Sequence, residues 1–172
     1  MPARTGRRLT SAAAIGALIA AGLAACGGGG ASSTTTSAAT ELTKSQLIAQ
    51  GDAICSDAHD RFAEVQSSPP TTSEEAATFT QRFLDITESE VSQLRALNAP
   101  ASVKPALDDY LKARDKQIAI LKQGLAAAQK GDATAYSQAQ AKVAKGQVNR
   151  LQLARAVGFK QCSVPAGTAP SG

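Results

Sequence analysis

Three cysteines are the residues of this 172-residue chain with the most distinctive chemistry, because a thiol can be modified, oxidised or bound to a metal. They are Cys26, Cys55 and Cys162. An odd count in an exported chain ordinarily leaves one free thiol, but modification of Cys26 would leave the other two as an even pair. We therefore expect a disulfide between Cys55 and Cys162, which is stable outside the cytoplasm. The alternative is that both are buried free thiols.

The residues before Cys26 suggest how it is modified. A basic N-terminal region precedes an apolar run over residues 12–23, and small residues then lead into the cysteine. The stretch Leu23-Ala24-Ala25-Cys26 resembles the lipobox of bacterial lipoproteins. This resemblance implies a signal peptide over residues 1–25 and a lipid on Cys26, such as palmitate, that anchors the protein to the extracytoplasmic face of the cell membrane.

Three other interpretations of this region are weaker or stay open. The apolar run is too short for a comfortable membrane span, which needs about 20 residues. An ordinary secretory signal cleaved after Ala25 would give no reason for a cysteine at the next position. The pair Arg7-Arg8 leaves twin-arginine export open beside the general route.

Arg114 and Arg150 are weak candidates for ligand binding. Arg114 interrupts an apolar stripe, and Arg150 lies on or near another. An arginine that faces the core of a helical bundle needs a partner or a ligand, because a buried unpaired charge is costly. The alternative is that their aliphatic stems pass along the apolar surface while the guanidinium groups reach water.

Catalytic and metal chemistry find little support, so we predict no enzyme activity, catalytic residue, metal site or cofactor. His59 is the single histidine and is expected at the surface or rim of the domain. No Glu-x-x-His pattern is present, and paired cysteines leave no thiolate for zinc. The acidic group Asp85, Glu88 and Glu90 is interpreted as a solvated face that could pair with Arg82 or Arg95.

Net charge argues against nucleic acid as a partner. The formal charge of the whole chain is +4, from 18 basic and 14 acidic residues. Residues 1–25 hold three arginines and no acid, so the remainder has 15 basic residues against 14 acidic ones, a formal charge of +1. A nearly neutral chain lacks the electrostatic footprint of a nucleic-acid-binding protein.

From residue 42 onward, apolar residues recur at spacings of three and four, which predicts four helices. Capping boxes at Thr43 and Thr72 begin the first two, and Asp132 is the expected N-cap of the fourth. Glycines at 131 and 158 are expected to end the last two. The predicted stripes comprise Leu47, Gly51, Ile54, Ala58, Phe62 and Val65; Phe79, Phe83, Ile86, Val91, Leu94 and Leu97; Leu107, Leu111, Arg114, Ile118, Leu121, Leu125 and Ala128; and Tyr136, Ala139, Val143, Gly146, Leu153 and Val157.

Short connections between these helices predict an all-α, up-down-up-down four-helix bundle. We expect a signal peptide over 1–25, a lipid anchor and flexible linker over 26–41, the bundle over 42–162 and a disordered tail over 163–172. The disulfide constrains this arrangement. Cys162 reaches Cys55 if the chain reverses after Gly158 and runs along the first helix. The distance is shorter if the fourth helix ends early or breaks at Gly146, or if the first helix begins nearer Leu47.

Two segments at the ends of the predicted bundle carry a second resemblance. Gly51-Asp52-Ala53-Ile54-Cys55 and the segment from Ala154 to Cys162 resemble parts of small helical lipoproteins of high-GC Gram-positive bacteria. The resemblance spans nearly the whole chain after the signal peptide. It implies an envelope lipoprotein without catalytic residues.

Two functions are compatible with these observations, and we expect the first of them. The first is a membrane-anchored, non-enzymatic binding or interaction module, whose partner is another protein of the cell envelope. The alternative is a carrier or sensor of a small apolar or anionic ligand, held where Ala139, Gly146 and Ala154 leave the fourth helix thin. A closed core would favour the first, and a lined cavity of a few hundred cubic ångströms the second.

Overall fold

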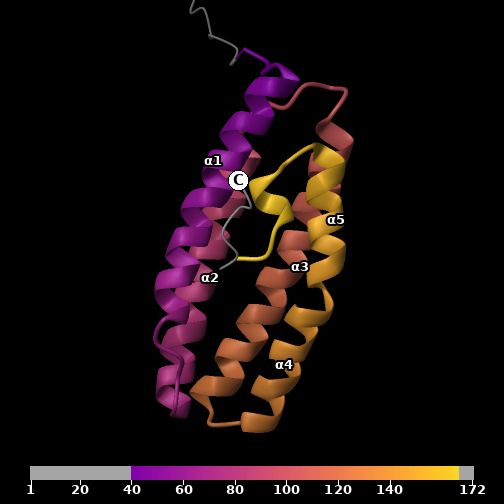
Figure 1. Cartoon of the computed structure of the whole chain (residues 1–172). Helices are drawn as coiled ribbons and strands as arrows, with labels where there is room; N and C mark the ends of the chain where they lie inside the picture. Colours follow the sequence, from indigo (N-terminus) through magenta and orange to yellow (C-terminus); the bar gives the residue numbers. More distant parts are fainter. Residues whose placement is uncertain (1–39, 167–172) are drawn as a thin grey trace, which may run out of the picture. The chain divides into compact units, whose positions relative to one another are not determined.

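The computed structural model describes residues 40–166, and these residues form an all-α bundle (Figure 1). The first three helices and the last, which is interrupted at Gly146, run in alternating directions, which confirms the predicted up-down-up-down fold. The helices are α1 (Lys44–Gln66), α2 (Ser73–Ala96), α3 (Lys104–Gln129), α4 (Ala133–Lys145) and α5 (Gln147–Val157), followed by the short 3-10 helix η1 (Gln161–Ser163).

The predicted signal peptide, Cys26 and the linker up to residue 39 lie outside the described residues. Within residues 40–166, no helix combines the length and the apolar character that crossing a membrane requires.

Local capping sets where the helices begin, as the sequence predicted. Thr43 and Thr72 each accept a hydrogen bond from the backbone N–H three residues later, and the Gln46 and Glu75 side chains each accept one from the capping residue's own N–H. Asp132 Oδ1 accepts from Ala135 N at 2.9 Å and begins α4. These caps satisfy backbone donors that the first helical turn leaves without partners.

The predicted fourth helix is divided at Gly146 into α4 and α5. The Arg150 side chain on α5 extends across this junction to α4, where Nη2 donates to the Val143 carbonyl at 3.1 Å. A Cβ at position 146 would lie 2.7 Å from Arg150 Nη1, so glycine leaves the space that the guanidinium occupies. The break was one of the alternatives that the disulfide constraint suggested.

Two apolar clusters fill the bundle. The larger one contains Leu47, Cys55, Val91, Leu94, Val103, Leu107, Tyr110, Leu111, Ala154, Val157, Phe159 and Cys162. The smaller one contains Ala58, Phe62, Val65 and Ile86, with Phe79, Phe83 and Ala166 packed against it. Along α2, the buried polar residues Thr87 and Glu90 lie between the parts of the helix that enter the two clusters. The interior therefore has a polar layer between two apolar regions.

After α5 the chain reverses and returns to α1, as the disulfide required. Gly158 adopts the left-handed conformation with φ of 104°, which glycine tolerates without steric cost. We call residues 158–166 the C-terminal strap. Asp52 on α1 accepts hydrogen bonds from the backbone N–H groups of Lys160 and Gln161, each at 2.8 Å. Figure 1 shows this yellow segment crossing from α5 to α1.

A disulfide fixes the strap to α1. It joins Cys55 to Cys162 with a Cα–Cα distance of 5.2 Å, so the predicted pairing is confirmed. Next to it, Phe159 lies so close to α1 that a Cβ on Gly51 would fall 2.2 Å from the Phe159 ring. Gly51 therefore lets an aromatic ring pack directly against the helix backbone.

The boundary of the predicted disordered tail needs correction. Residues 163–166 have a defined position: Ser163 is buried, and its carbonyl accepts from Arg155 Nη2 at 3.3 Å. Ala166 packs against the smaller apolar cluster. The sequence suggested a tail because Ser163, Val164 and Pro165 carry no helical pattern, but the disulfide holds this segment against the bundle. Residues 167–172 lie outside the described part of the chain.

Candidate functional site

The polar layer opens into a cavity of about 260 Å³ inside the bundle, which we call the interhelical cleft. Every α-helix contributes to its wall, and the C-terminal strap closes one side with Cys162, Val164, Pro165 and Ala166. Gln66, Ala144 and Gln147 line the cleft and are exposed to solvent, so they lie at its rim. The cleft thus connects the core with the outside between α1 and the α4–α5 junction.

A buried ion pair forms one wall of the cleft. Glu90 on α2 contacts Arg114 on α3 through Oε2 and Nη2, and the two residues are 4% and 8% exposed. Arg114 Nη1 also donates to Gln117 Oε1 at 2.8 Å. Tyr110 donates its hydroxyl hydrogen to Glu90 Oε1 at 3.5 Å. Arg114 Nε is buried without a hydrogen-bond partner among the described residues.

Arg150 on α5 is the second guanidinium of the cleft, and it is differently placed. Its described hydrogen bond goes to the Val143 carbonyl, and it forms no ion pair with any described carboxylate. Burial, followed by the charge of Arg114, lowers the pKa of Arg150 to about 10. At neutral pH this side chain remains positively charged, without a counter-ion of its own.

The charges that line the cleft do not cancel. Burial raises the pKa of Glu90, and the charge of Arg114 opposes this effect. Direct contact with the guanidinium favours the ionised carboxylate at neutral pH. Burial and the charge of Arg114 lower the pKa of His59, so this imidazole is neutral there. Two guanidinium groups then face one carboxylate, which leaves one positive charge unbalanced.

The other part of the cleft is apolar. Phe62 and Phe83 both line it, and their ring centroids lie 4.9 Å apart. Val143, Leu151, Val164 and Ala166 extend this apolar surface. Glutamine side chains surround the rest of the wall, at positions 66, 117, 140 and 147. An anionic group and a hydrocarbon body could therefore be accommodated in the same cavity.

Part of this site was predicted from the sequence. Arg114 and Arg150 come from different predicted helices, and the structure brings both to the interhelical cleft. His59, expected at the surface or rim, is half-buried and lines the cleft as well. The arginine candidates are therefore neighbours of a single cavity.

The interpretation of Glu90 as part of a solvated face is wrong, because this residue is buried against Arg114. Arg82 and Arg95 do not pair with the acidic group either: they contact Glu64 and Asp115. A signal for Glu90 was present in the sequence. Phe83, Thr87, Glu90 and Leu94 follow one another at spacings of four, three and four, which places Glu90 on the buried stripe of α2.

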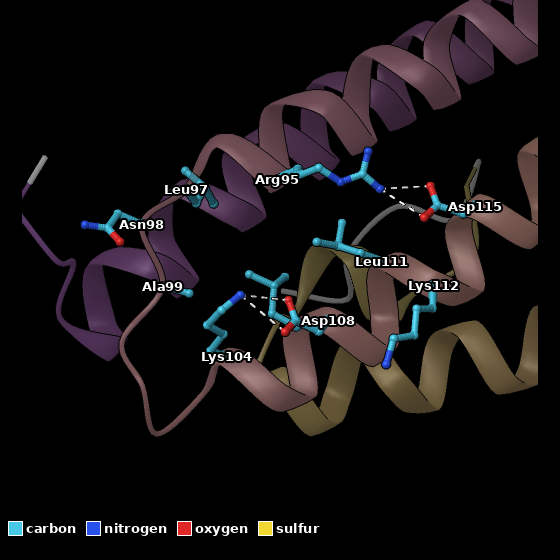
Figure 2. Close-up of a pocket in the computed structure, with 10 residues that line it drawn as sticks. Arg95, Leu97, Asn98, Ala99, Lys104, Asp108, Leu111, Lys112 and Asp115 are labelled. Carbon is cyan, nitrogen blue, oxygen red and sulfur yellow. Dashed lines mark hydrogen bonds and ion pairs between the residues drawn. The ribbon is translucent and has the colours of Figure 1, made fainter.

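A second hollow, of about 390 Å³, lies at the surface between α2 and α3 (Figure 2). Each of its charged side chains has an ion-pair partner. Arg95 contacts Asp115 at 2.9 Å, Lys104 contacts Asp108 at 3.1 Å, and Lys112 contacts Asp109 outside the hollow. With its charges already matched, this groove offers less to an ionic ligand than the cleft does.

The cleft suits binding better than bond-breaking chemistry. Its cysteine is held in the disulfide, and burial raises the pKa of Tyr110 well above its ordinary value. Among residues 40–166, no group of three or more histidine, cysteine, aspartate or glutamate side chains is arranged to hold a metal ion. What the described residues do provide is a positively charged position beside an apolar surface.

Comparisons with known proteins add no relative from which a function could be transferred. No protein-family model matches the sequence, and no curated protein or solved structure shows significant similarity to it.

Proposed function

We propose that this chain is a lipid-anchored, extracytoplasmic binding protein that carries or senses a small anionic ligand in the interhelical cleft. The observation that supports this proposal most directly is the unpaired positive charge of Arg150 beside a buried, already neutralised Arg114–Glu90 pair. Arg150 is only partly buried, but a charge partly removed from water without a counter-ion is still unfavourable, and a bound anion would reduce that cost.

The cleft also helps to choose between the two functions that the sequence left open. A lined cavity of about 260 Å³ with convergent polar groups resembles a small ligand site, just below the usual size range of about 300–1,000 Å³. No comparable feature among the described residues specifies an envelope protein as the partner. We therefore favour the carrier or sensor over the interaction module, and we assign no catalytic step to either.

Anchoring rests on the sequence around Cys26 alone. Replacing Cys26 with serine is expected to block lipidation and to accumulate the uncleaved precursor, because a lipoprotein peptidase requires the lipidated cysteine. Membrane fractionation and the mass of the mature N-terminus measure both effects. Normal cleavage together with unchanged membrane retention of Cys26→Ser would show that the anchor is something else.

Replacing Arg150 with glutamine is expected to weaken anion binding by about 10- to 100-fold, the effect of losing one charge-assisted hydrogen bond. The substitution removes the charge and leaves a polar side chain at this position. Calorimetric titration of the purified protein with benzoate, octanoate, suberate and inorganic phosphate provides the measurement. Amide chemical shifts around the cleft locate any anion that binds.

The matched control is Lys130→Gln, which removes the same charge from an exposed side chain that does not line the cleft. Lys130→Gln should bind anions like the unmodified protein. If no anion of the panel binds, or if Arg150→Gln binds as tightly as the control, the proposed function is refuted.

A further inference from the structure

The charge balance of the cleft limits what its ligand can be. One positive charge is left over from Arg114, Arg150 and Glu90, so a ligand with one negative charge neutralises the site. A second negative charge in the same cavity would face the Glu90 carboxylate, which interacts with both guanidinium groups. Repulsion between like charges is stronger in a partly buried cavity than in bulk water.

Geometry assigns the binding role to Arg150 rather than Arg114. The two terminal nitrogens of Arg114 are engaged by Glu90 and Gln117. Arg150 uses Nη2 for the Val143 carbonyl, while Nη1 lies over Gly146. A guanidinium group with free N–H donors matches the geometry of a carboxylate. Gln117 belongs to the polar part of the wall of the same cleft.

The apolar part of the cleft indicates the chemistry of the rest of the ligand. The rings of Phe62 and Phe83 form an apolar surface together with Val143 and Leu151. This surface favours a hydrocarbon body over a polar one. A cavity of 150 Å³ holds a benzene molecule, so 260 Å³ accommodates about ten non-hydrogen atoms on the same scale. This size fits a short-chain or aromatic acid and is too small for a membrane phospholipid.

We propose that the ligand is an amphipathic monocarboxylate whose carboxylate contacts Arg150 and whose hydrocarbon body lies on Phe62 and Phe83, and that Glu90 excludes doubly charged anions. This inference rests on the proposed function and makes it more specific. Glu90 acts here as a specificity-determining residue. Its negative charge faces the cleft and repels the second negative charge of a dianion, while its ion pair with Arg114 leaves it unavailable to a cationic ligand.

The test compares ligands of matched length on the unmodified full-length protein at pH 7.5. Octanoate has one carboxylate, suberate has two, and octan-1-ol has none. Calorimetry is expected to show that octanoate binds at least tenfold more tightly than suberate, octan-1-ol or inorganic phosphate. Equal or tighter binding of suberate or phosphate would overturn the monocarboxylate assignment while leaving anion binding intact. Binding of no anion would instead refute the proposed function.

A variant tests the role of Glu90 separately. Glu90→Gln keeps the size of the side chain and removes the charge, so the ratio of octanoate to suberate affinity should fall at least fivefold. Circular dichroism establishes that the variant remains helical before the titration. An unchanged ratio in a folded variant would show that Glu90 does not set specificity. The ligand series on the unmodified protein does not depend on this variant, so a folding failure leaves the inference testable.

Discussion

Replacing Cys55 and Cys162 together with serine is expected to lower the free energy of unfolding by about 4–5 kcal/mol. The bridge joins residues separated by 107 positions, and the chain-entropy model assigns about this stabilisation to a loop of that length. Two apolar positions of the larger cluster also become polar, which adds to the loss. Urea denaturation followed by circular dichroism measures the change.

The unmodified protein treated with a reductant provides the comparison for this variant. It lacks the bridge but keeps the native atoms at both positions, so it separates the effect of the cross-link from the effect of serine. We expect the reduced protein and the serine variant to lose similar amounts of unfolding free energy, with the serine variant slightly less stable. A loss below 1 kcal/mol in both would mean that the strap is held by its other contacts.

Arg114→Met is expected to destabilise the protein by about 3–5 kcal/mol, because it leaves the Glu90 carboxylate buried without its counter-ion. The additional exchange Glu90→Leu should recover most of this loss, since an apolar pair of similar volume replaces the ion pair. Urea denaturation of the two single variants and the double variant gives the coupling energy.

Two further measurements test whether the buried ion pair causes the loss of stability in Arg114→Met. Lys122→Met is the matched control, because Lys122 pairs with Glu88 at 2.8 Å between the same two helices but lies at the surface. We expect it to cost less than 1 kcal/mol. The loss in Arg114→Met should also depend on pH.

Burial already raises the pKa of Glu90, and Arg114 opposes that rise, so its removal raises the pKa further. An acid with a raised folded-state pKa contributes stability that is complete at low pH and is lost as pH rises through that pKa. The deficit of Arg114→Met should therefore be smaller at pH 5 than at pH 8. A deficit that is the same at both pH values would mean that an unpaired Glu90 charge is not responsible.

Much of the fold was predictable because its determinants are local. Thr43 and Thr72 begin helices through contacts only three residues away, and Gly158 reverses the chain through its own backbone conformation. The disulfide was predicted from the number of cysteines, and the pairing in turn suggested that the chain reverses after Gly158. Such features depend on short stretches of sequence, so they can be recognised without knowing how the helices pack.

The cleft was harder to predict, because it depends on contacts between distant segments. Arg114 was conspicuous as a charge on an apolar stripe, but Glu90 stood next to other acidic residues and was grouped with them. Its position in the helical repeat indicated burial, whereas its acidic neighbours suggested exposure. The strap residues 163–166 carried no signal of their own, since the disulfide and the bundle surface determine their position.

The position of the disulfide also determines how the chain responds to tension. The bridge connects the middle of α1 to the strap, so α2, α3, α4 and α5 all lie within the closed loop. A pulling force applied at the two ends of the chain passes through the S–S bond and bypasses these helices. Only the segment before Cys55 and the few residues after Cys162 can then be extended. Reduction would release 107 residues of hidden length, on the order of 350 Å when fully stretched.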